Sequence, residues 1–162
     1  MAYAKGTTVS IEKSQLEIRE LLRRNGADEF AQYEGKNVAK LSFRLAEKFH
    51  VLFEVPLPNR EDFATYTQQG RIWRRVEHQI DKAFHDECKR RWRSLLLCIK
   101  AKLEAAETGI STVEKEFLPF IVMGDGRTFA EHVIPRLTAQ NGKAYLPALP
   151  APVADDDDVI DV

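Results

Sequence analysis

Six basic residues between positions 71 and 100 recur at spacings that place them on one face of a helix. On a helical wheel, at about 100° per residue, they form one narrow stripe: Arg71, Arg75, Lys82, Lys89, Arg93 and Lys100. Residues 71–102 hold ten basic and four acidic side chains. A stripe of roughly 44 Å is long enough to follow many phosphates, and counterion release then supplies affinity without sequence specificity. The alternative is the ordinary solvated face of an amphipathic helix.

Two further cations extend this candidate phosphate-binding surface. Lys40 and Arg44 lie on the polar side of a predicted β-hairpin, as in sheet-based proteins that bind single strands. That side carries no aromatic ring, so a base-stacking platform would have to come from Tyr33, Tyr66 or Trp73. Plain surface charge is again the alternative interpretation.

The C-terminus has the opposite charge. The last twelve residues hold five aspartates and no base, so residues 1–150 carry a net charge of +4, from 24 basic and 20 acidic side chains. This acidic segment follows an Ala/Pro-rich linker and resembles the acidic tails of bacterial single-stranded-DNA-binding proteins. It lacks the proline and the terminal phenylalanine of those tails. The resemblance implies that the tail recruits a protein partner through Asp155, Asp156, Asp157, Asp158, Val159, Ile160 and Val162. A solubilising tail that competes weakly for the basic body is the alternative.

The inventory of catalytic residues is thin. The chain has no Walker loop, no dinucleotide-binding glycine fingerprint and no nucleophile elbow. Asp81, His85 and Cys88 have helical spacing, but they do not complete a zinc-site pattern. We therefore expect a protein that is not an enzyme and that uses no metal and no cofactor.

Cysteine usage and hydropathy indicate the compartment. Cys88 and Cys98 are ten residues apart in one predicted helix, about 15 Å along its axis, which is too far for a mutual disulfide. No signal peptide and no run of about 20 apolar residues is present. We expect a cytoplasmic protein with reduced thiols and no membrane association.

Local patterns predict the elements of the first half. Residues 7–12 read as a short β segment, and Ser14 with Glu17 reads as a capping box that opens a helix ending at Gly26. Strands are predicted at 29–34, 38–45 and 49–55, of which the last two alternate strictly between apolar and polar residues. Residues 59–70 are polar and predict a mobile loop.

The strongest signal is a helix over residues 71–108, which contain no glycine or proline. Apolar residues recur there every three or four positions, and Gly109 follows as the predicted C-terminal cap. At about 55 Å such a helix outreaches a small sheet, so it must protrude, kink or pack on another subunit. Arg91 falls among its apolar positions, which predicts snorkelling, an acidic partner or a subunit interface. A last helix opens with a capping box at Thr128 and Glu131.

These elements predict one α+β domain over residues 1–143 and a disordered linker and tail over 144–162. The domain is expected to have a small antiparallel sheet in β-α-β-β-β order, packed with the long helix and a short last one. The sequences RRWRSLLLCIKAKLE at 90–104, EFL at 116–118 and GDGRT at 124–128 are similar to a family of uncharacterised bacteriophage and bacterial proteins.

That resemblance, over about residues 7–147, implies a phage setting and assigns no functional residue. Two function classes follow. The first is a nucleic-acid-binding accessory protein of replication or recombination, acting on single- or double-stranded DNA. The alternative is a protein-interaction module that oligomerises through its long helix or inhibits a host factor.

Overall fold

The structure is a computed structural model that describes residues 6–139. Its elements run along the chain as α1 (Ile11–Arg24), β1 (Ala27–Glu34), β2 (Val38–Leu45), β3 (Phe49–Pro56), η1 (Arg60–Phe63), β4 (Thr65–Gln68), β5 (Arg71–Arg74), α2 (Glu77–Glu107), α3 (Val113–Phe117), η2 (Leu118–Phe120) and α4 (Phe129–Ala139). The predicted α+β class is confirmed, as is the long helix. No described helix is both long and apolar enough to cross a membrane.

Strands β1, β2 and β3 form an antiparallel sheet in that order. The alternation predicted for residues 38–45 is confirmed, because Ala39, Leu41, Phe43 and Leu45 are all buried. Strand β1 is interrupted by a bulge between Asp28 and Ala31, where Glu29 has a φ of 51°. The bulge lets Ala27 and Phe30 both contact the core face.

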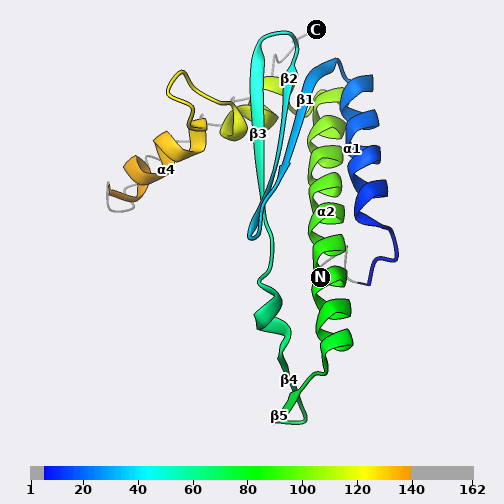
Figure 1. Cartoon of the computed structure of the whole chain (residues 1–162). Coiled ribbons are helices and arrows are strands. Elements are labelled where there is room, and N and C mark those ends of the chain that lie inside the picture. The colour runs from blue at the N-terminus through cyan, green and yellow to red at the C-terminus, as the bar shows by residue number, and fades with distance from the viewer. Residues whose placement is uncertain (1–5, 140–162) are drawn as a thin grey trace, which may run out of the picture.

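Helices α1 and α2 pack together against one face of this sheet (Figure 1). The core between them contains Ile18 and Leu22 of α1, and Trp92 and Ile99 of α2. Phe117 of α3 closes it from the C-terminal side, with its ring edge against Phe43 and Phe53. The polar side of β2 therefore faces away from both long helices.

The start of α1 corrects the sequence prediction. Residues 7–10 carry no strand, and the helix begins at Ile11 with Ser10 as its N-cap. Ser10 Oγ accepts from the Lys13 backbone N–H at 3.2 Å, whereas Ser14 is buried inside the helix. The predicted capping box at Ser14 and the predicted first strand were therefore wrong, and the sheet keeps only the three later strands. The helix ends at Arg24, and the predicted Gly26, whose φ is 79°, follows its C-cap.

The start of α2 is a second correction. Residues 71–74 are the strand β5, and the helix begins only at Glu77. β5 pairs with β4, which lies in the segment predicted to be a loop. The two residues between them, Gln69 and Gly70, have φ values of 50° and 74°, the signature of a tight hairpin turn of type I′.

Helix α2 nonetheless has 31 residues and extends beyond the sheet, as its predicted length required. Its first turns run down past η1 to the β4–β5 hairpin, which forms one extremity of the molecule (Figure 1). Of the three predicted outcomes for an over-long helix, protrusion is the one observed. Gly109, with a φ of 76°, follows its C-cap as predicted.

Helix α4 projects from the other side of the sheet (Figure 1). Its predicted capping box is confirmed, because Thr128 N–H donates to Glu131 Oε2 at 2.7 Å and Glu131 N–H donates back to Thr128 Oγ1 at 3.4 Å. Pro135 lies inside the helix, and no residue of α4 is buried.

Candidate nucleic-acid interface

The two predicted phosphate contacts of the sheet are engaged by carboxylates. Lys40 pairs with Glu54 on the neighbouring strand. Arg44 pairs with Asp28 and Glu29, at 2.8 Å in each case, and this bonding raises the pKa of the guanidinium. Both side chains alternate with core residues of β2, so they lie on the sheet face opposite α2. The structure does not bring them together with the cations of the helix.

The C-terminal half of α2 holds two more of the predicted residues. Arg93 and Lys100 lie along a groove between α1 and α2. Arg93 Nη1 donates to Glu17 Oε2 of α1 at 2.7 Å, and Glu20 lines the same groove. Lys100 is exposed and has no ion pair among residues 6–139. This region is mixed in charge.

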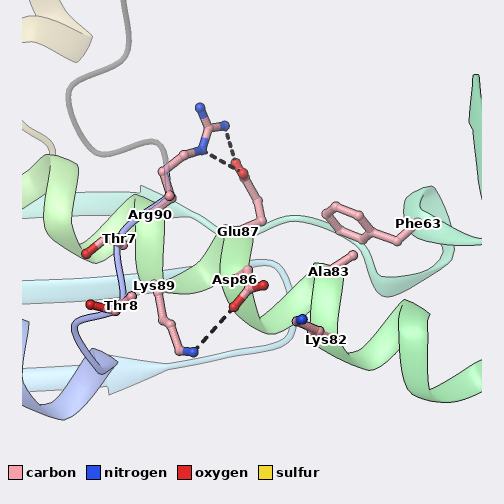
Figure 2. A pocket seen from close by; sticks show the side chains of 10 residues that line it. Thr7, Thr8, Phe63, Lys82, Ala83, Asp86, Glu87, Lys89 and Arg90 are labelled. Carbon is pink, nitrogen blue, oxygen red and sulfur yellow. Dashed lines mark hydrogen bonds and ion pairs between the residues drawn. The ribbon is translucent and has the colours of Figure 1, made fainter. Parts of the chain in front are cut away.

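The middle of α2 borders a larger hollow of about 880 Å³, beside residues 6–8 and Phe63 (Figure 2). Lys89 pairs there with Asp86 at 3.3 Å. Glu87 accepts from both Arg90 and Arg91 and its pKa is lowered, first by the hydrogen bond from Arg90.

Arg91 thus has an acidic partner on its own helix, which is one of the three outcomes that its wheel position predicted. Lys82 also lines this hollow (Figure 2), and it has no ion pair among residues 6–139.

The remaining two predicted residues, Arg71 and Arg75, belong to the β4–β5 hairpin and its exit. Tyr66 stands directly opposite Trp73 in the register. Gln68 and Arg71 form the next pair along the same face, because side chains two residues apart share a face of a strand. Thr65, Thr67, Ile72 and Arg74 occupy the other face.

Arg75 fixes the base of this hairpin. Its Nη1 donates to the carbonyl oxygens of Phe63 and Thr65, each at 2.9 Å, and its guanidinium lies 4.7 Å from the centroid of the Tyr66 ring. Its backbone N–H donates to the carbonyl of Ala64 at 2.8 Å, which closes the two ends of the hairpin against each other. Arg75 is therefore positioned by backbone oxygens and an aromatic face, and no carboxylate neutralises it within the described chain.

Two acids at the start of α2 are engaged by a neighbouring cation. Arg60 of η1 bridges Glu77 and Asp81 of the first turns of α2, and these hydrogen bonds raise its pKa. The ring of Phe63 packs edge-on against Phe84 at 6.3 Å, so η1 is held to the helix by both polar and apolar contacts. The bridge directs these two carboxylates toward Arg60 and away from pairing with the hairpin arginines.

Three features of the hairpin suit binding to a nucleic acid. Residues 64–76 contain three arginines and no acid. Trp73 is 50% exposed and Ile72 is 77% exposed. Guanidinium groups bind phosphate, and an exposed indole can stack on a base. A further hollow, of about 340 Å³, lies beside the hairpin. Its lining includes Tyr66 and Arg75 and, on α2, Lys82.

Arg74 and the hairpin itself were missed by the sequence analysis. Helical spacing of the arginines favoured a continuous helix, although two signals pointed the other way. Gln69-Gly70 is a turn dipeptide, and the flanking TYT and RIW segments are rich in β-branched and aromatic residues. Reading both together would have predicted a hairpin.

A separate polar cluster links α4 to the turn before it. Asp125 accepts from His132 at 3.0 Å and from the Arg127 side chain at 2.8 Å, so the pKa of its carboxyl lies well below the usual range. This cluster lies on the surface and fixes the first turns of α4.

The predicted tail residues, from Asp155 to Val162, lie outside the described residues. Comparisons of the chain with protein-family models, with curated proteins and with solved structures found no match to any of them.

Proposed function

We propose that this chain is a non-catalytic nucleic-acid-binding accessory protein, and that the β4–β5 hairpin with the adjoining start of α2 is its contact surface. The phage setting that the resemblance implies supports a role in DNA replication or recombination. The acidic tail recruits a protein partner in this proposal.

One observation carries the proposal: Arg71, Arg74 and Arg75 project on a hairpin that holds no acid and exposes an indole. Four of the other cations offered by the sequence differ, since Lys40, Arg44, Lys89 and Arg93 each have a carboxylate partner. A phosphate has to displace these carboxylates, whereas it meets Arg71 and Arg74 directly and Arg75 beside the carbonyls that position it. We therefore assign the first contacts to Arg71, Arg74 and Arg75, with Lys82 extending them, and a secondary role to the paired residues.

The test is a titration of single-stranded DNA, duplex DNA and RNA with the full chain over a range of salt concentrations. Arg71→Gln/Arg74→Gln is compared with Lys13→Gln/Arg19→Gln, which removes the same net charge from exposed positions of α1. Loss of two phosphate contacts lowers the salt dependence of log K by about 1.4 on single strands and about 1.8 on duplex.

We expect that reduction for the hairpin variant and a wild-type salt dependence for the α1 variant. Equal weakening by both variants would assign the affinity to net charge and not to the hairpin. Binding that does not respond to salt would contradict the proposed function.

A protein-interaction module is the second candidate, and α4 favours it. Ile134 and Leu137 are 57% and 61% exposed on a helix that projects from the body (Figure 1). The long helix is less suited to self-association, because Trp92 is fully buried in the chain's own core. This candidate predicts a discrete oligomer in light scattering that Ile134→Ser/Leu137→Ser dissociates, and no shift of DNA.

A further inference from the structure

A hollow at the tip of the hairpin has a lining that differs from the rest of the cationic surface. It measures about 420 Å³ and is lined by Gln68, Gln69, Arg71 and Trp73. The volume lies within the range of small-molecule sites, about 300–1,000 Å³. All four residues are exposed, so the hollow is an accessible notch on one face of the hairpin.

The indole of Trp73 forms the apolar wall of this hollow. On the same face, the Tyr66 ring is already covered by the Arg75 guanidinium at 4.7 Å. No ring or cation is paired with Trp73 within the described part of the chain. Trp73 is 50% exposed, although tryptophan is usually among the most buried side chains. A large, rigid aromatic face is thus presented to solvent beside polar groups.

The other three residues supply the hydrogen bonds that a heteroaromatic ring requires. The amides of Gln68 and Gln69 each offer both donors and an acceptor, and Arg71 offers a fork of donors with a positive charge. This combination matches the edge of a nucleobase, which displays donors and acceptors around a flat π system. An apolar protein side chain would displace water from these groups without replacing its hydrogen bonds, so the lining favours a base as the occupant.

We propose that the hairpin tip is a binding site for one unpaired nucleobase. Trp73 stacks on the base, Gln68 and Gln69 bond to its edge, and Arg71 holds the adjoining phosphate. A base inside a duplex is stacked on both faces and cannot enter the hollow, so the site selects single strands. This inference rests on the proposed function, because it assigns the strandedness of the same surface.

The experiment compares three probes of matched phosphate number with the full chain: an oligothymidine, the same oligomer built from abasic sugars, and a duplex. Affinity is measured by anisotropy and base contact by quenching of tryptophan fluorescence. Trp73 is exposed whereas Trp92 is fully buried, so a stacked base quenches Trp73 selectively. In Trp73→Phe the remaining emission reports Trp92 alone.

We expect the oligothymidine to bind about fivefold to a hundredfold more tightly than the abasic oligomer and the duplex, since stacking of one base supplies a factor in this range. Trp73→Ala should abolish the difference, and Trp73→Phe should retain most of it. Tyr33→Ala, at a ring that is 60% exposed on the sheet, and Ile72→Ala, on the other face of the hairpin, should leave it unchanged. Melting curves confirm that each variant is folded.

The outcomes separate this inference from the proposed function. Equal, salt-dependent binding of all three probes would overturn the base site and leave the cationic hairpin standing. Absence of binding to every probe would overturn both. Self-association that disappears in Trp73→Ala, without quenching by any probe, would assign Trp73 to a protein contact and overturn the inference.

Discussion

At the scale of single residues, ion pairing divides the cations of this chain into two classes. Arg44 meets two carboxylates and Arg60 meets two more, so these side chains are held in fixed directions. Arg71 and Arg74 have no such partner among residues 6–139. Exposed ion pairs contribute only about 0–1 kcal/mol each to stability, so the pairing matters here for which cations are free to bind an external anion.

Trp92 shows another consequence of side-chain environment. It is fully buried between α1, α2 and the sheet, and its Nε1 has no hydrogen-bond acceptor among the described residues. An unpaired buried N–H costs about 1–3 kcal/mol, which is comparable with what the additional ring area contributes. The two effects oppose each other at this position.

We therefore predict that Trp92→Phe changes the free energy of unfolding by less than about 1.5 kcal/mol, whereas Trp92→Ala lowers it by about 3–5 kcal/mol. Urea denaturation of the two variants measures both values. A large loss in Trp92→Phe would show that the indole N–H has a partner in solution.

At the scale of elements, the first helix shows how a cap is selected. The sequence pattern predicted Ser14 as the N-cap, whereas the structure uses Ser10. The apolar positions decide between them, because Ile18 and Leu22 reach the core only if Ser14 is also turned inward. The helix consequently starts one turn earlier, at the next serine upstream.

This arrangement predicts unequal effects of two matched serine substitutions. Ser10→Ala removes the acceptor of the Lys13 N–H and should lower the free energy of unfolding by about 1 kcal/mol. Ser14→Ala should cost less, because the Ser10 carbonyl that its hydroxyl contacts also accepts from the Ser14 backbone N–H at 3.1 Å. Thermal or chemical denaturation compares them, and the reverse order would restore Ser14 as the cap.

At the scale of the whole molecule, the chain divides into a packed body and an arm. The sheet, α1 and the C-terminal half of α2 contain nearly all of the core, while η1 and the hairpin accompany the N-terminal turns of α2 (Figure 1). Beyond isolated contacts, β4 and β5 pack only on each other among the described elements, and neither contains a buried residue. The hairpin is thus supported at its base and free along its length.

We predict that the hairpin can be removed without unfolding the body. Joining Ala64 to Arg75 through two glycines is feasible, because these residues are already hydrogen-bonded to each other at 2.8 Å. The variant should keep the circular dichroism and the cooperative melting of the full chain, and should lose nucleic-acid binding. Loss of cooperative melting would show that the arm is part of the folding unit.

Much of this organisation was determined by the sequence itself. Strict alternation over 38–45 identified a half-buried strand, and the three- and four-residue spacing of apolar residues identified α2. The capping box at Thr128 and the glycines at 26 and 109 marked helix ends. Each of these signals is local, because it depends on the period of one element or on the backbone freedom of one residue.

Only the tertiary structure decided where α2 begins and which cations remain free. Residues 71–75 fit a helical wheel and a strand equally well, and it is pairing with residues 65–68 that makes them a strand. Likewise Arg93 is neutralised by Glu17, which lies 76 residues away in sequence. Periodicity describes the faces of one segment, but it carries no information about which other segment will lie against them.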